Sequence, residues 1–349
     1  MTTLENGVRL TSLSHGGGCG CKLAPAVLEK IIAGTVGGLT PPDLLVGVET
    51  SDDAAVYRIN ETQAIVATTD FFMPIVDDPF DFGAIAATNA ISDVYAMGGT
   101  PLFALALVGM PIDKLSVETI RKILEGGQSV CRRAGIPVAG GHSVDSVEAI
   151  YGLVAIGIVD PRNLKRNSTA RPGDKIVLGK PLGVGVYSAA HKSEQLSDAL
   201  YREFIASTTK LNTPGPKLAR LDGVHALTDV TGFGLLGHLV EVCKGSGVRA
   251  TVRWDDLPFL PEAATLAKAG HVTGASGRNW AGYGDLIDLG SHDKTARQLL
   301  TDPQTSGGLL VTCAPGAVEE VLATFRAEGF DRAVVIGEIQ SGAPGVSVV

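Results

Sequence analysis

The chain has 349 residues, a formal net charge of −8 and five cysteines, and its composition favours a close-packed α/β or α+β enzyme over a disordered or fibrous protein. No block of Lys or Arg indicates a nucleic-acid surface, and the apolar stretches are too short to cross a bilayer. Because the first residues carry no secretory signal and the cysteines lack disulfide-framework spacing, we expect a cytoplasmic protein.

The Gly/Cys-rich run from Ser14 to Lys22 is the first segment that suggests chemistry. Its glycines leave the backbone without a preferred structure, and a cation near Cys19 and Cys21 favours the reactive thiolate. A disordered tail is one alternative, and half of a metal site is another, although no second close cysteine pair completes a four-thiolate site. We interpret residues 1–48 as a flexible Gly/Cys-rich N-terminal segment.

The rest of the chain divides into two regions of alternating strand and helix signals. In the first, residues 49–160, apolar runs and helical spacing predict strands over 64–69, 102–108, 136–139 and 151–159 and helices over 81–97 and 116–134. This order is typical of an α+β or α/β sandwich. The second region, residues 171–349, contains predicted strands at 175–178 and 309–312 and predicted helices around 198–210 and 235–243.

Several carboxylates lie where charge repulsion or burial should be unfavourable unless a ligand compensates for it. Asp52 and Asp53 are adjacent, Asp70 ends a predicted strand, and Asp229 precedes a Gly-rich turn that runs into a helix. A divalent cation explains such a set, and hard oxygen ligands favour Mg²⁺ over a soft transition metal. Each Asp alone is also typical of a turn or a helix cap.

Two further polar features fall in apolar or glycine-rich surroundings. Asn89 and Asp93 lie four residues apart on one apolar face of the predicted helix, where a metal, a ligand or a neighbouring loop is needed to satisfy them. The run Gly140–Ser143 follows a predicted strand and can approach a phosphate or ribose closely, with a tight turn as the alternative. No P-loop or H-E-x-x-H motif occurs.

Together these segments closely resemble the selenophosphate synthetase family, whose members are also called selenide, water dikinases. The resemblance covers nearly the whole chain and is carried, in the family's order, by residues 14–22, 52–57, 68–77, 87–93, 140–143, 227–238 and 302–309. It implies a two-domain α+β fold of the aminoimidazole-ribonucleotide-synthetase-like type, with an N-terminal domain that dimerises through its strands and a C-terminal α+β sandwich.

The resemblance also implies an activity and its partners. ATP, selenide and water would give selenophosphate, orthophosphate and AMP, with Mg²⁺ as cofactor, and the product would supply activated selenium for selenocysteine and selenouridine synthesis. A homodimer is implied, and a selenium-delivery protein is a further partner to consider.

By motif match, the family's catalytic positions fall at Cys19 and Lys22, and its Mg²⁺ carboxylates fall at Asp53, Asp93 and Asp229. Its nucleotide contacts fall at Lys22, Thr50, Ser51, Asp52, Asp70, Asp93, Gly141, His142 and Ser143, with the last three as candidates for donation by the other subunit.

The rival interpretations are of two kinds. Aminoimidazole ribonucleotide synthetases, thiamine-monophosphate kinase and a hydrogenase-maturation dehydratase share the fold, but the dehydratase carries a C-terminal reactive Cys where this chain ends in valine. A non-enzymatic metal or selenium carrier that uses His15, Cys19 and Cys21 would explain the thiols but not the carboxylates.

Overall fold

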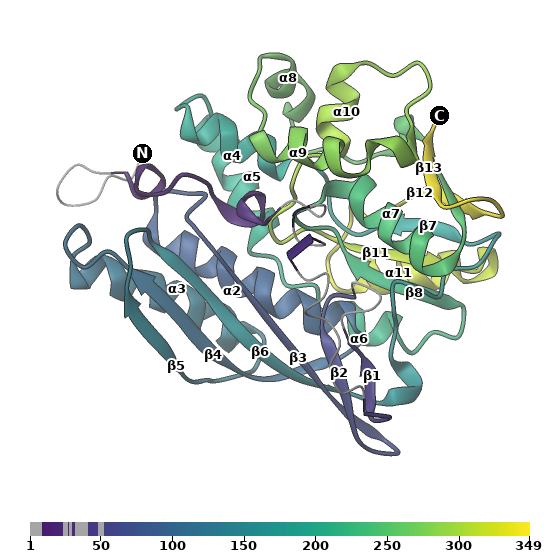
Figure 1. Ribbon diagram of the computed structural model, residues 1–349, viewed down its shortest axis with the longest axis horizontal. Coiled ribbons are helices and arrows are strands. Elements are labelled where there is room, and N and C mark those ends of the chain that lie inside the picture. The colour runs from purple at the N-terminus through teal and green to yellow at the C-terminus, as the bar shows by residue number, and fades with distance from the viewer. Residues whose placement is uncertain (1–8, 24–26, 28–29, 32–40, 48–51) are drawn as a thin grey trace.

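The computed structural model describes residues 9–23, 27, 30–31, 41–47 and 52–349. Within these residues, a six-stranded and a seven-stranded mixed sheet each pack against helices, and the two halves lie side by side (Figure 1). This arrangement confirms the predicted α+β fold class. No helix in the described part of the chain is long and apolar enough to span a membrane.

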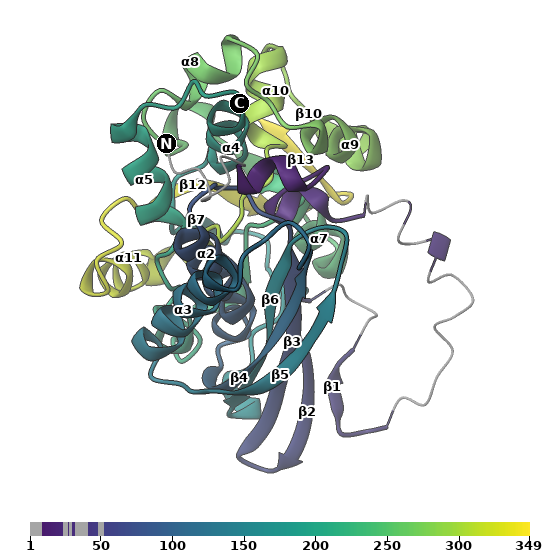
Figure 2. The same ribbon diagram turned by 90° about the vertical axis from the view of Figure 1, so that its left-hand side faces the viewer.

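The N-terminal sheet has the strand order β1-β2-β3-β6-β4-β5, antiparallel except for the β4–β5 pair. Helices α2 (Pro79–Ala96) and α3 (Val117–Arg133) cover one of its faces (Figure 2). The strands are β1 (Leu44–Val46), β2 (Ala55–Asn60), β3 (Gln63–Phe72), β4 (Thr100–Met110), β5 (Val138–Asp145) and β6 (Ile150–Val159).

Local sequence explains where these two helices begin and how closely they pack. The Asp78 side chain accepts the Asp81 N–H at the start of α2, and Ser116 caps α3 in the same way. Where the helices cross, a Cβ added to Gly126 would lie 2.0 Å from the Phe80 carbonyl oxygen. Glycine is therefore required there by backbone contact between α2 and α3.

The C-terminal sheet has the order β10-β13-β9-β12-β7-β11-β8. Its strands are β7 (Lys175–Leu178), β8 (Val224–Asp229), β9 (Arg249–Val252), β10 (Ile287–Asp288), β11 (Leu309–Cys313), β12 (Val334–Gln340) and β13 (Gly345–Val348). The α-helices are α4 (Val184–Lys192), α5 (Asp198–Thr208), α6 (Gly215–Leu218), α7 (Gly234–Ser246), α8 (Ala263–Lys268), α9 (Gly274–Tyr283), α10 (Lys294–Leu300) and α11 (Val318–Ala327). Short 3₁₀ turns are η1 (Leu10–Leu13), η2 (Gly18–Cys21), η3 (Pro161–Asn163), η4 (Trp254–Asp256), η5 (Gly284–Leu286) and η6 (Pro315–Ala317).

One predicted strand was placed wrongly. The predicted strand over 136–139 was expected to end before Gly140–Ser143. Instead, β5 begins at Val138, includes Gly140–Ser143 and continues to Asp145. Gly140 and Gly141 have φ of 148° and 152°, and β5 pairs with β4 through an irregular register at this point. The glycines therefore let the strand pass close to β4 instead of ending it, since a Cβ on Gly141 would lie 2.0 Å from the Ala106 oxygen.

Candidate active site

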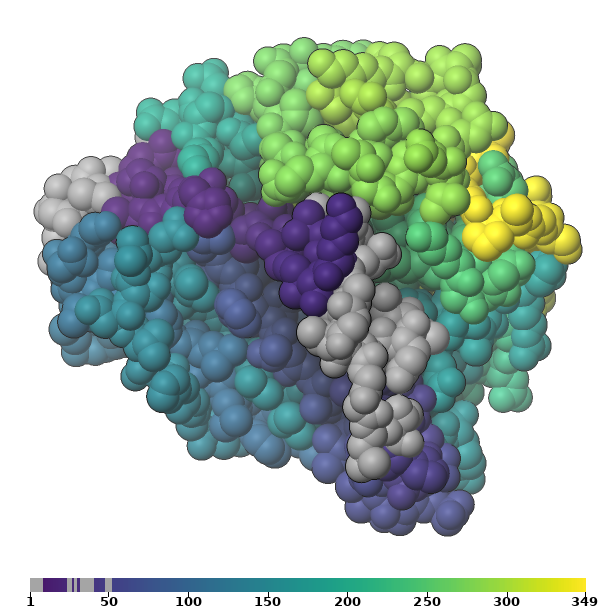
Figure 3. Space-filling view, in the orientation of Figure 1, coloured from purple at the N-terminus to yellow at the C-terminus, as the bar shows by residue number. Residues whose placement is uncertain are grey.

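The described part of the N-terminal segment, residues 9–23, is called the arm below. It lies in the seam between the two halves of the molecule (Figure 3). The Gly18 N–H donates to the Met73 oxygen at 2.8 Å, and Arg278 Nη2 donates to the Gly20 oxygen at 2.8 Å. The arm therefore contacts both domains at once.

Three carboxylates from three separate elements meet beneath the arm. Asp53 lies just before β2, Asp93 is on α2, and Asp229 ends β8 in the other domain. Asp93 and Asp229 are almost fully buried, at 9% and 1% exposure. This group is called the carboxylate cluster below.

Each member of the carboxylate cluster accepts a hydrogen bond from a hydroxyl group. Thr68 Oγ1 donates to Asp93 Oδ2 at 2.6 Å, and Thr228 Oγ1 donates to Asp53 Oδ1 at 2.8 Å. Ser92 Oγ donates to Asp229 Oδ2. Sequence reasoning did not assign these hydroxyls a role, although each stands within two residues of an Asp in its motif.

The electrostatics of the carboxylate cluster favour a bound cation. Burial raises the pKa of Asp53, Asp93 and Asp229, and the charge of Asp229 raises the pKa of the other two further. Asp53 Oδ2 is buried without a hydrogen-bond partner in the described structure. Among the described residues, no group of three or more His, Cys, Asp or Glu side chains is placed to hold a metal ion by itself, so an ion here would need ligands from a substrate or water as well.

A second group of polar side chains joins the carboxylate cluster to the arm. Lys22 Nζ lies 3.1 Å from Asp70 Oδ2, and Asn89 Nδ2 donates to the same oxygen at 2.6 Å. Desolvation is the largest single effect and opposes the Lys22 ammonium, but the charge and hydrogen bond of Asp70, together with the charges of Cys19 and Asp93, raise the Lys22 pKa well above its usual value. The Lys22 side chain stays 38% exposed, so water partly screens this ion pair.

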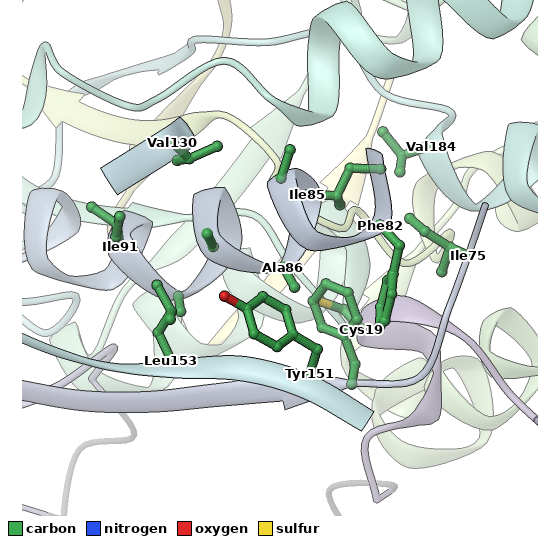
Figure 4. Packing of buried hydrophobic residues seen from close by; sticks show 14 of the residues in the cluster. Cys19, Ile75, Phe82, Ile85, Ala86, Ile91, Val130, Tyr151, Leu153 and Val184 are labelled. Carbon is green, nitrogen blue, oxygen red and sulfur yellow. The ribbon is translucent and has the colours of Figure 1, made fainter. Parts of the chain in front are cut away.

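Cys19 is buried rather than presented to solvent. It is 1% exposed and belongs to the same apolar cluster as Ile75 and Phe82 (Figure 4). Burial raises the pKa of its thiol far above the usual value and outweighs the opposing charge of Lys22. The expectation that a nearby cation makes this thiol acidic is therefore wrong for the arm packed in the seam, which is called the closed arm below. In this position Cys19 Sγ donates to Asn89 Oδ1 at 3.2 Å.

The predicted nucleotide contacts are only partly brought together. Asp52 Oδ1 accepts the Asn167 N–H at 2.8 Å, next to the carboxylate cluster, whereas Thr50 and Ser51 lie outside the described residues. Gly141–Ser143 are exposed on β5. Gly141 is at the same level of the sheet as Asp70 but three strands away, so the two residues are separated by about 14 Å. A single chain therefore does not place them at the carboxylate cluster.

Behind the carboxylate cluster lies a buried lysine that sequence reasoning missed. Lys180, 3% exposed, donates from Nζ to the Lys210 oxygen at 2.6 Å and to the Ser306 oxygen at 2.7 Å. Burial lowers its pKa to about 7. Nothing in its sequence context distinguishes it from a surface lysine.

Comparison with known proteins shows which families this chain resembles. Residues 51–159 match the family model for the AIR synthase related protein, N-terminal domain, and residues 171–349 match that for the C-terminal domain. The chain is 67% identical over 346 residues to a selenide, water dikinase of Dechloromonas aromatica (strain RCB), covering 99% of both chains. It is 63% identical to a selenide, water dikinase of Pseudomonas straminea, covering 99% of this chain and 98% of the relative.

The chain belongs to the selenide, water dikinase family. Its activity is therefore the ATP-dependent synthesis of selenophosphate from selenide, with phosphate and AMP as the other products. A solved structure of thiamine-monophosphate kinase from Stenotrophomonas maltophilia K279a matches with a TM-score of 0.65 at 23% identity, covering 94% of this chain and 96% of that one. At that identity the likeness shows the shared fold alone.

Proposed function

We propose that Asp53, Asp93 and Asp229 hold Mg²⁺ and that Mg²⁺ links them to the phosphates of ATP. The observation that carries this proposal is the convergence of three carboxylates from both domains, one of them with an unpartnered buried oxygen. The donor set consists of hard oxygens, which suit Mg²⁺. When bound, Mg²⁺ offsets the negative charge of the phosphates during transfer.

Lys22 and Cys19 are the proposed catalytic residues of the arm. Lys22 is held by Asp70, and its ammonium would offset charge on the phosphoryl group as selenide attacks the γ-phosphorus and the bond to the ADP oxygen breaks. The closed arm would exclude bulk water at this stage. Water would then split the remaining ADP into AMP and orthophosphate in the same place.

Cys19 is left with two proposed roles, carrying selenium to the phosphate or helping to close the arm. Its burial and its bond to Asn89 support the second role in this conformation. Asp52, Asp70, Thr50 and Ser51 are proposed as nucleotide contacts.

A homodimer is proposed from the uncovered face of the N-terminal sheet. Along β3, Val66 and Phe72 point to the helices and are buried, whereas Ile65 and Phe71 point to the opposite face and are 37% and 50% exposed. Tyr57, the β2 partner of Ile65, is also 42% exposed. An apolar sheet face of this kind is typical of an interface between copies of a chain.

Such a dimer gives the predicted residues on β5 a place in the site. Gly141, His142 and Ser143 would be donated to the nucleotide of the second copy, which accounts for their distance from the carboxylate cluster in one chain. We also propose a division into a domain of residues 49–160 and a domain of residues 171–349, after a segment of residues 1–48, with β1 (Leu44–Val46) of that segment joining the first domain as the edge strand of its sheet. We further propose a cytoplasmic location, which the five free cysteines support, and a selenium-delivery protein as a partner.

Thermal unfolding tests the Mg²⁺ site directly. Mg²⁺ with a non-hydrolysable ATP analogue should raise the melting temperature of the natural protein, and Asp53→Asn, Asp93→Asn and Asp229→Asn should each lose most of that increase. Asp255→Asn, at an exposed carboxylate far along the chain, is the matched control. Phosphorus NMR of Mg-ATP with selenide should show selenophosphate and AMP for the control but not for the three variants. Full Mg²⁺-dependent stabilisation of all three variants would contradict the site.

A further inference from the structure

The loop of residues 302–308, called the 302–308 loop below, is held rigidly although it carries none of the predicted site residues. Asp302 Oδ2 accepts the Gly185 N–H at 2.8 Å, and Gln304 Oε1 accepts the Gly183 N–H at 3.0 Å at the start of α4. Its far end is bound to the residue that follows β8, because the Val230 N–H donates to the Gly308 oxygen at 2.9 Å. The loop is therefore a fixed part of the C-terminal domain.

The same loop also contacts the N-terminal domain. The Ser306 N–H donates to Asn89 Oδ1 at 2.7 Å, and Ser306 Oγ donates to the Ile85 oxygen at 3.1 Å. Ser306 has a φ of 52°, in the left-handed region that non-glycine residues rarely adopt, and the Lys180 ammonium donates to its carbonyl oxygen. The surrounding bonds thus hold a strained residue in place.

Between these anchored residues, Thr305 faces the arm. Its Oγ1 accepts the Cys19 N–H at 3.0 Å, and both groups are buried. A Cβ added to Gly18, which has a φ of 53°, would lie 2.4 Å from this Oγ1. The arm therefore approaches Thr305 as closely as a backbone without a side chain allows.

From these contacts we propose that Thr305 is a positioning residue, which holds the arm closed and thereby sets Cys19 and Lys22 against the carboxylate cluster. The Cys19 N–H is buried in the closed arm, so removing its acceptor leaves it unpaired in that state only. The closed state would then lose population to the open state. The proposal rests on the roles proposed above for Cys19 and Lys22, but the closure itself is measurable without them.

The test uses full-length protein and the variants Thr305→Val and Thr305→Ser. Valine keeps the shape of threonine without the hydroxyl, and serine keeps the hydroxyl. Thr324→Val on α11 is the matched control, because that hydroxyl donates within its own helix, to the Glu320 oxygen at 2.8 Å. The first readout is the alkylation rate of Cys19, measured by peptide mass spectrometry with the buried Cys243 as an internal reference.

Alkylation needs a thiolate, and the closed arm holds the Cys19 thiol neutral and shielded, so the rate reports the open fraction. Thr305→Val should raise the Cys19 rate about five- to tenfold, Thr305→Ser should stay within about twofold of the natural protein, and Thr324→Val should not change it. Gly18→Ala, which acts from the arm side, should raise the rate as Thr305→Val does. A Cys19 rate unchanged in Thr305→Val would overturn the proposal.

The second readout is the steady-state synthesis of selenophosphate. Thr305→Val should lower kcat with little change in the KM for ATP, and Thr305→Ser should restore kcat, because the hydroxyl positions the arm rather than the nucleotide. Faster alkylation with unchanged kcat would overturn the positioning role of Thr305 and leave the proposed roles of Cys19 and Lys22 to their own variants. The Cys243 rate shows whether a variant has simply lost its fold.

Discussion

Replacing Phe71 with alanine should weaken the proposed homodimer strongly while leaving the chain folded. Phe71 is 50% exposed near the C-terminal end of β3, on the sheet face opposite α2 and α3. Its cross-strand partner on this face is Gly152 of β6. Half of this large apolar ring is thus exposed in the described structure, beside a glycine that offers no side chain, and a partner could cover it.

The size of the effect follows from the exposed half of the ring. A phenylalanine side chain buries about 200 Å² when fully covered, so covering the exposed half removes about 100 Å² from water. At about 25 cal/mol per Å², this is worth about 2.5 kcal/mol per chain. A twofold interface counts it twice, so Phe71→Ala should cost about 5 kcal/mol, or three to four powers of ten in the dimer dissociation constant.

Sedimentation velocity over a range of protein concentrations measures this constant. Val117→Ala is the matched control, because Val117 is 73% exposed but lies on α3, on the other side of the sheet. The natural protein and the control should remain dimeric at concentrations where Phe71→Ala is monomeric. Equal dissociation constants for Phe71→Ala and Val117→Ala would refute the assignment of this face as the interface.

Three further outcomes follow from the described contacts. Asp53→Asn should raise the free energy of unfolding by about 1 kcal/mol in the presence of a chelator, because it removes one of three mutually repelling buried carboxylates. Selenophosphate synthesis by the same variant should fall at least a hundredfold. A variant that is less stable in urea titration would contradict this prediction. Lys180 has a pKa lowered to about 7 by burial, below its unfolded value of 10.5, so the natural protein should gain up to about 1.4 kcal/mol per pH unit between pH 7 and 10, and Lys180→Met should flatten that slope. Gly126→Ala should cost about 2–4 kcal/mol in thermal unfolding because its Cβ meets backbone, whereas Gly277→Ala on α9, where nothing lies within 4 Å, should be neutral or slightly stabilising.

Local patterns predicted the parts of this molecule that depend on local contacts. The cap at Ser116, the glycine after the helix at Gly135 and the apolar face between them gave α3 almost to the residue. The four-residue spacing of Asn89 and Asp93 also placed both side chains on one face of α2, where they now accept and donate hydrogen bonds to β3 and the arm.

Non-local contacts were beyond such patterns. Asp53 lies just before β2, and Asp229 ends β8 in the other domain. Their charges interact in the fold, but no sequence periodicity relates the two positions. The burial of Cys19 was missed because a glycine-rich run has no apolar period, although its glycines are what allow the arm to pack so closely. Continuation of β5 through Gly141 was missed for a related reason, because a pair of glycines is typical of a turn.

The charges in the seam suggest that closure of the arm and binding of the nucleotide should each make the other more favourable. Asp70 and the carboxylate cluster put several negative charges in one partly desolvated region, and the arm brings Lys22 to it as a positive charge. ATP adds further negative charge, which makes both the proposed Mg²⁺ and Lys22 more favourable than in the protein alone. In the proposed mechanism, the acceptor at Thr305, which binds the Cys19 N–H, would keep Lys22 from withdrawing when the triphosphate is cleaved. Losing that acceptor should therefore matter most in the transition state, where the charge on the transferred group changes while the arm must stay in place.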